Sequence, residues 1–201
     1  MNRRSILMVP VMVMATALPA LADKLSLNAI SAYLNTLETA GADFTQINDD
    51  GSISTGKLLI KRPGRIRFQY NPPEELLVVA GGGAVGIFDG RSNRAEPEQY
   101  PLKRTPLNLI LERNVNLARR DMVTGHGYDG TATTVRAQDP DNPEHGYIDL
   151  KFTDNPVELR QWVITDSAGI QTTVVLGKLA NGLSLPAHLF SITAETQKRK
   201  R

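Results

Sequence analysis

The chain has 201 residues, a length typical of one folded domain, and a formal net charge of +2. It contains no cysteine, which excludes disulfide bonds and a thiol nucleophile. The basic excess comes from the ends of the chain. Without residues 1–22 and the basic tail at residues 198–201, acidic residues outnumber basic ones, which argues against nucleic acid as a partner.

The first 22 residues have the pattern of an export signal. Two arginines near the start precede an apolar run from Ile6 to Leu18, and small residues stand before Asp23 as at a cleavage site. The run is too short to span a bilayer comfortably, although an uncleaved anchor is the alternative. We predict a cleaved signal peptide over 1–22 and one domain over 23–201, exported by the general secretory or the twin-arginine route.

The first element predicted in the folded domain is an amphipathic helix over residues 25–39. Its apolar residues recur at helical spacing, and Gly41 ends the pattern. The apolar face consists of Leu27, Ile30, Leu34 and Leu37.

Strands follow this helix and are separated by turn residues such as Asp50-Gly51 and Pro63-Gly64. The predicted strands cover residues 42–47, 52–62, 65–71, 75–80 and 85–89. Polar and apolar residues alternate along the second and third of them. We expect the cationic face, with Arg65 and Arg67, to meet water, and the apolar face to close over a core or a guest. The apolar face carries Leu58, Ile60, Ile66, Phe68 and Tyr70.

A short helix is predicted after Thr105-Pro106, with Thr105 as its cap and its end near Arg113. Its apolar side carries Leu107, Ile110 and Leu111. Further strands are predicted over residues 122–128, 131–138, 147–154, 157–166, 170–178 and 189–193. Strands of this length with short turns favour an antiparallel barrel or a sandwich.

Few patterns in the chain point to catalysis. The run from Gly81 to Gly86 matches a dinucleotide-binding fingerprint by letter, but it leads into a strand where a nucleotide site needs a helix, so we interpret it as a hairpin turn. The three histidines lack zinc-ligand spacing, and the acidic residues are scattered over turns. We therefore predict no enzyme, no cofactor and no metal; a hydrolase with a pair of carboxylates is the alternative.

Arg62 stands at a strand end, against the Pro63-Gly64 turn. A guanidinium there could donate to backbone carbonyls across a gap, and an ordinary exposed arginine is the alternative.

Several of these blocks resemble the LolA family of periplasmic outer-membrane lipoprotein carriers. The blocks are Ala42-Asp43-Phe44-Thr45-Gln46 and the run from Gly56 to Pro73, with its Arg-Pro-Gly-Arg turn followed by Phe-x-Tyr. Thr105-Pro106-Leu107 and the ending from Leu185 to Phe190 also fit. The resemblance covers nearly all of residues 23–201 and is most specific between 42 and 111. Ile66 departs from the aromatic residue of many members.

The resemblance implies an incomplete antiparallel β-barrel, a half-barrel closed by helices that form a lid over an apolar cavity. Acyl chains of a lipoprotein would lie in this cavity. It also implies that Arg62 holds the lid shut in the empty form by bonding helix backbone. The implied cavity and acyl-chain-binding residues are Leu58, Ile60, Ile66, Phe68, Tyr70, Leu107, Ile110 and Leu111.

The implied partners are lipoproteins, an inner-membrane ABC-type complex that releases them, and an outer-membrane acceptor lipoprotein of the LolB type. The acceptor carries lipid on a cysteine, so we expect this cysteine-free chain to be the soluble periplasmic carrier. A periplasmic lipid- or protein-sensing regulatory module on the same fold is the alternative.

Overall fold

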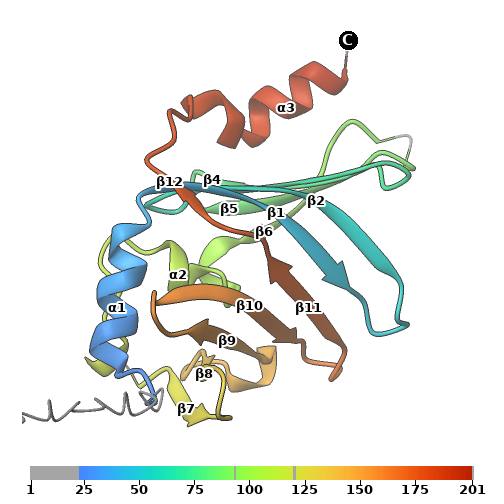
Figure 1. The fold of residues 1–201 in the computed structure, drawn as a ribbon. Helices are drawn as coiled ribbons and strands as arrows, with labels where there is room; N and C mark the ends of the chain where they lie inside the picture. Colours follow the sequence, from blue (N-terminus) through green and yellow to red (C-terminus); the bar gives the residue numbers. More distant parts are fainter. Residues whose placement is uncertain (1–22, 93, 120, 201) are drawn as a thin grey trace, which may run out of the picture.

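A curved antiparallel sheet dominates the structure, with two helices at its concave side and a third on its outer face (Figure 1). The computed structural model describes residues 23–92, 94–119 and 121–200. The predicted signal peptide over residues 1–22 lies outside the described residues, as does Arg201 at the end of the basic tail.

The described part of the chain forms twelve strands and three α-helices. The strands are β1 (Thr39–Ile47), β2 (Ile53–Lys61), β3 (Ile66–Tyr70), β4 (Leu76–Gly81), β5 (Ala84–Asp89), β6 (Glu98–Pro101), β7 (Val123–Tyr128), β8 (Thr133–Gln138), β9 (Tyr147–Thr153), β10 (Glu158–Thr165), β11 (Gln171–Leu176) and β12 (Ala180–Asn181). The α-helices are α1 (Leu27–Thr36), α2 (Asn108–Leu111) and α3 (Ile192–Arg199). Short 3-10 helices are η1 (Leu102–Arg104), η2 (Leu117–Arg119), η3 (Pro143–His145) and η4 (Ala187–Phe190).

The sheet is an open half-barrel. Its strands follow the order β6-β5-β4-β3-β2-β1-β11-β10-β9-β8-β7, and β12 adds to β1. All pairings are antiparallel, and β6 and β7 stand at the two ends of this order. The prediction of an incomplete antiparallel barrel is therefore confirmed.

The alternating residues of β2 and β3 line the concave face, as predicted. Leu58 pairs with Phe68, and Ile60 pairs with Ile66, so these side chains share one face of the sheet. All four are at most 6% exposed. Burial of each large apolar side chain contributes about 1.5–3 kcal/mol, which makes this face a main source of stability.

Helix α1 begins at a capped end and buries one face. The Ser26 hydroxyl accepts a hydrogen bond from the Ala29 N–H at 3.1 Å, so Ser26 is the N-cap. Ile30 and Leu34 are buried against the sheet. The predicted helix is confirmed, with shorter ends.

Helix α2 differs from its prediction in its start. Thr105 is not the cap, because its hydroxyl donates to the Leu102 carbonyl at 2.8 Å and the helix begins only at Asn108. Pro106 lies in a turn that precedes the helix. The helix itself is one turn long and brings Leu109, Ile110 and Leu111 into the core.

The predicted strand over residues 189–193 is wrong. This segment forms the end of η4 and the start of α3, because the Ser191 hydroxyl accepts from the Ala194 N–H at 3.1 Å and caps a helix. Strands β6 and β12 were not predicted. β6 carries prolines at and beside its ends, and such residues suit an edge strand that pairs on one side.

The cationic outer face of β3 is covered rather than wet. Arg67 is 8% exposed, donates to the Leu189 carbonyl at 3.1 Å and lies 3.5 Å from the Glu195 carboxylate. The expectation that this face meets water is therefore wrong at Arg67. Ile192 of α3 completes the cover by packing on a small apolar cluster of Leu77, Val79 and Phe88.

The segment of η4 and α3, which we call the C-terminal cover, packs closely on the sheet at Gly81. A Cβ atom there would lie 2.0 Å from the Phe190 carbonyl oxygen, so β4 and the cover could not both keep their positions. We expect Gly81→Ala to lower the free energy of unfolding by more than about 1 kcal/mol and to accelerate hydrogen exchange in α3. Gly127→Ala on β7 is the control, because its Cβ would meet nothing within 4 Å. Equal effects of the two substitutions would contradict the tight fit.

Candidate functional site

The structure brings together all eight side chains that were predicted to bind acyl chains. They come from β2, β3 and the region of α2, and they belong to one buried apolar cluster. Each is at most 9% exposed. These eight residues are Leu58, Ile60, Ile66, Phe68, Tyr70, Leu107, Ile110 and Leu111.

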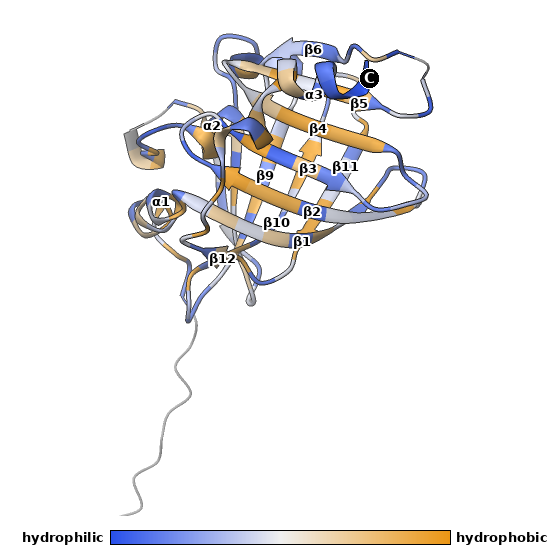
Figure 2. Cartoon of the chain, turned by 90° about the horizontal axis from the view of Figure 1, so that it is seen from above, coloured by the Kyte–Doolittle hydropathy of each residue, from blue (hydrophilic) through white to orange (hydrophobic). Residues whose placement is uncertain are grey.

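The cluster lies between the concave face of the sheet and the segments that cover it. Figure 2 shows apolar stretches along β2 and β4, with α1 and α2 at the same end of the sheet. In this arrangement the apolar residues of the sheet pack against those of the two helices.

Aromatic residues form the wall of this interior beyond β3. The Phe68 ring meets the Trp162 ring edge to face at 6.0 Å, and the Phe44 ring at 5.5 Å. Trp162, Phe44 and Leu109 were not among the predicted site residues. Trp162 was missed because β10 carries a register shift between Leu159 and Gln161, which breaks the alternation that would place Trp162 inside.

Tyr70 brings one polar group to the apolar wall. Its hydroxyl donates to the Gln46 side-chain oxygen at 2.6 Å, which satisfies the buried phenol. Burial is the main cause that raises the pKa of Tyr70 to about 12. Tyr70 therefore stays neutral at ordinary pH.

Arg62 joins the β2–β3 turn to both covering segments. Its Nε donates to the Glu112 carbonyl at 2.9 Å, and its Nη2 donates to the Arg113 carbonyl at 3.2 Å. On α1 the guanidinium donates to the Leu34 carbonyl and, at 3.1 Å, to the Asn35 side-chain oxygen. Burial lowers the pKa of Arg62 from its usual value, so this guanidinium is partly removed from water rather than freely exposed.

Among residues 23–92, 94–119 and 121–200, no group of three histidine or acidic side chains could hold a metal ion. The run from Gly81 to Gly86 forms the β4–β5 hairpin, with Gly82 and Gly83 at φ of +62° and +83°. It opens no helix, so the interpretation as a turn is confirmed. Among all the residues that the structure describes, no helix is both long and apolar enough to cross a bilayer.

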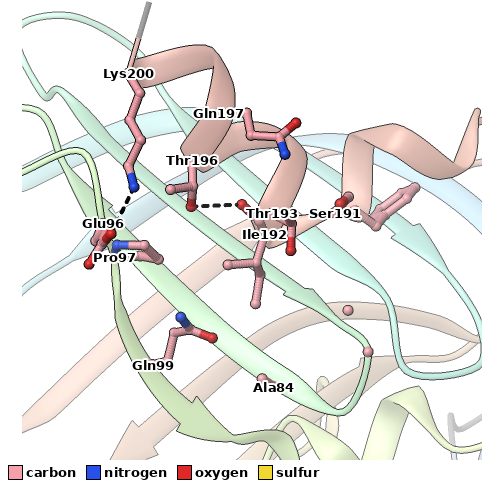
Figure 3. A pocket seen from close by; sticks show the side chains of 13 residues that line it. Ala84, Glu96, Pro97, Gln99, Ser191, Ile192, Thr193, Thr196, Gln197 and Lys200 are labelled. Carbon is pink, nitrogen blue, oxygen red and sulfur yellow. Dashed lines mark hydrogen bonds and ion pairs between the residues drawn. The ribbon is translucent and has the colours of Figure 1, made fainter.

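A separate groove of about 710 Å³ lies on the outer face, between α3 and the β5–β6 edge of the sheet. Figure 3 shows Ile192 and Thr196 on the helix side, and Glu96 and Gln99 opposite them. Lys200 closes one end through an ion pair with Glu96 at 2.8 Å. The groove shares no lining residue with the apolar interior.

Comparison with known proteins agrees with the fold. A family model described as "Outer membrane lipoprotein carrier protein LolA" matches residues 35–193. An "Outer-membrane lipoprotein carrier protein" of Azotobacter vinelandii is 32% identical, with 86% of each chain covered. A protein of the same name from Legionella pneumophila (strain Paris) is 28% identical over 82% of this chain and 84% of its own.

A solved structure from Vibrio parahaemolyticus, a "putative outer membrane lipoprotein-sorting protein domain", has a similar fold. The TM-score is 0.50 at 9% identity, covering 85% of this chain and 97% of that one.

The raised pKa of Tyr70 predicts a loss of stability at high pH. An unfolded tyrosine ionises near pH 10, whereas Tyr70 in the folded protein ionises at about 12. The contribution of Tyr70 to the free energy of unfolding is therefore fully present below about pH 10. It is lost as the pH rises towards 12, which lowers the free energy of unfolding by about 2–3 kcal/mol. Denaturant unfolding of wild type and Tyr70→Phe across this range measures the effect. The variant should lack this part of the pH dependence, and a constant difference between the two proteins would contradict the prediction.

Proposed function

This chain belongs to the LolA family, and we propose that it is a periplasmic carrier that binds the acyl chains of lipoproteins. The acyl chains would lie between the concave face of the sheet and the segments around α1 and α2. The observation that carries this proposal is Arg62, whose side chain bonds both covering segments beside a predominantly apolar interior. Such a cover can be released without breaking a strand pairing.

The energetics of lipid transfer explain why a carrier is needed. Burial of a methylene group contributes about 0.8 kcal/mol, so one acyl chain in water costs on the order of 10 kcal/mol. Transfer of several chains through water without a carrier would therefore be very slow. An apolar interior that accepts these chains removes most of this cost.

The closed form protects this interior when no guest is present. Leu34 and Ile110 on the covering side pack in the same cluster as Phe68 on the sheet, so the empty protein exposes no large apolar patch there. Opening costs these contacts and the hydrogen bonds of Arg62, each worth about 1.5–3 kcal/mol for a charged donor. This cost is subtracted from the affinity for the guest, which eases its release.

Delivery in two steps completes the proposed role. Lipoproteins would arrive from an inner-membrane ABC-type releasing complex and pass to an acceptor lipoprotein of the LolB type in the outer membrane. The absence of cysteine supports the carrier over the acceptor, because the acceptor needs a lipid-bearing cysteine. The role is one of binding and transfer, without catalysis.

The function of Arg62 as a latch is tested with Arg62→Leu. Loss of its hydrogen bonds favours the open form, so a synthetic triacylated lipopeptide should bind about tenfold more tightly and pass more slowly to acceptor-containing liposomes. Arg65→Leu is the control, because Arg65 lies on the same turn but donates only locally, to the Lys61 carbonyl at 3.2 Å. Unchanged affinity and transfer rate in Arg62→Leu would refute the latch.

The acyl-chain site is tested with Phe68→Asp. A carboxylate in the apolar interior opposes acyl binding because a charge is costly to bury there. We expect loss of lipopeptide binding by at least about 100-fold. Gln69→Asp, at the one exposed position of β3, should bind normally. Normal loading of a folded Phe68→Asp variant, with its circular dichroism unchanged, would place the acyl chains elsewhere.

A further inference from the structure

The apolar concave face of the sheet continues beyond the buried interior. Val78 of β4 pairs with Phe68 on one side and with Ile87 on the other, so all three share this face. Leu76, two residues before Val78 on the same strand, shares it too. Leu76, Val78 and Ile87 are only partly buried, whereas Phe68 is 6% exposed. Apolar surface therefore extends from the closed interior into a region that is partly open to solvent.

A groove of about 630 Å³ lies over this region, and we call it the β4–β6 groove. Leu76 and Ile87 form its apolar floor. Glu98 of β6 pairs with Ile87, so a carboxylate borders the floor directly. The groove lies at the β5–β6 loop, at the opposite end of the sheet from α1 (Figure 1). The charged residues that line it are Asp89, Arg94, Glu96 and Glu98.

The other face of the same strands is covered. Leu77, Val79 and Phe88 alternate with the residues of the floor, and each is at most 2% exposed beneath α3. On the concave side, by contrast, Tyr100 of β6 is 48% exposed, and its hydroxyl donates to the Glu98 carboxylate at 3.0 Å. Exposed apolar surface with a polar rim is typical of a binding site.

We propose that the β4–β6 groove binds the polypeptide segment that follows the lipidated first residue of the cargo lipoprotein. This inference rests on the proposed function and assigns a second subsite to the same ligand. The acyl chains are attached to the first residue, so the peptide has to leave the apolar interior where that interior meets solvent. Val78 lies at this junction, because it packs against the buried cluster and pairs with Ile87 on the floor of the groove.

The distance from the interior to the groove suits a short peptide. Neighbouring strands are about 4.8 Å apart, so Phe68 on β3 and Ile87 on β5 are separated by about 10 Å. An extended chain advances about 3.4 Å per residue, so about three residues span this distance. We therefore expect the third to fifth residues after the lipidated one to lie on the floor.

The chemistry of the lining favours a peptide over a hydrocarbon tail. A carboxylate that loses water to a hydrocarbon gains no hydrogen bond in return. A peptide, however, offers apolar side chains to the floor and N–H groups to Asp89 and Glu98. The Glu96 carboxylate already pairs with Lys200 at 2.8 Å. The other two carboxylates outnumber Arg94, so the lining favours a neutral or basic segment.

Photo-crosslinking locates the two parts of the ligand. A synthetic triacylated lipopeptide of ten residues carries benzoylphenylalanine at its fourth residue, and a second version carries a diazirine near the end of one acyl chain. We expect the peptide probe to label β4, β5 or β6, and the acyl probe to label the interior around Phe68.

The outcomes of this experiment separate the inference from the proposed function. Labelling of the interior by the acyl probe, without labelling of β4–β6 by the peptide probe, would overturn the peptide subsite and leave the carrier standing. Labelling of β4–β6 by the peptide probe, while the acyl probe labels no interior residue, would retain the peptide subsite and contradict the acyl-chain site. Absence of labelling by both probes would contradict both.

The floor of the groove is tested with Ile87→Ser. The measured quantity is the ratio of the affinities for triacylated lipopeptides of ten residues and of one residue. Loss of apolar contact with the peptide should lower this ratio about fivefold. Ile53→Ser is the matched control, because Ile53 is 65% exposed and shares the outer face of β2 with Lys57. An unchanged ratio in a folded Ile87→Ser variant, with the circular dichroism of wild type, would overturn the subsite.

The charge of the rim is tested with Glu98→Lys. Wild type should bind a lipopeptide with lysine at its fourth residue about threefold more tightly than one with glutamate, and less selectively in about 1 M salt. Glu98→Lys should reverse this preference. Glu144→Lys, at an exposed position of η3, is the control. The wild-type preference in Glu98→Lys would overturn the charge complementarity on which the choice of a peptide rests.

Discussion

The structure depends on one guanidinium that satisfies the ends of two helices at once. The last carbonyls of a helix have no partner within the helix, and a cation near them is favourable. Arg62 donates to Leu34 near the end of α1 and to Glu112, the residue after α2. α2 is only four residues long and would not be stable alone. Its place over the interior follows from apolar burial together with these bonds.

Strand β3 supports the position of Arg62 because two neighbouring side chains on its opposite faces, Arg67 and Phe68, are buried. Phe68 points into the apolar interior, and its neighbour Arg67 lies under the C-terminal cover. A strand fixed from both sides holds the β2–β3 turn in place. The turn therefore presents Arg62 from a strand that is packed on both sides.

Much of the fold could be predicted because its signal is local. The alternation at Leu58, Ile60, Ile66 and Phe68 gives the inner face, and helical spacing in residues 25–39 gives α1. The position of Trp162 could not be predicted, since a bulge is not visible in a single sequence. Phe44 could not be assigned to the site either, because its contact with Phe68 joins segments that are distant in the chain.

The C-terminal cover shows the same limit. Residues 189–193 contain apolar and β-branched residues typical of a strand, yet the Ser191 cap and the packing of Ile192 favour a helix. Arg67 looked like a surface residue because its partners, Leu189 and Glu195, lie more than 120 residues further along the chain. By contrast, the proline turn at Arg62 was a usable local signal, although its helix partners were implied only by family resemblance.

The sheet does not close on itself, because its strand order ends at β6 on one side and β7 on the other. A closed barrel has a radius fixed by its strand number and stagger. A sheet with a free seam can change its curvature while every ladder bond persists, so its width is not fixed by the strand pairing. Pro97 and Pro101 beside this seam discourage a foreign strand from sealing it, which keeps that elasticity available.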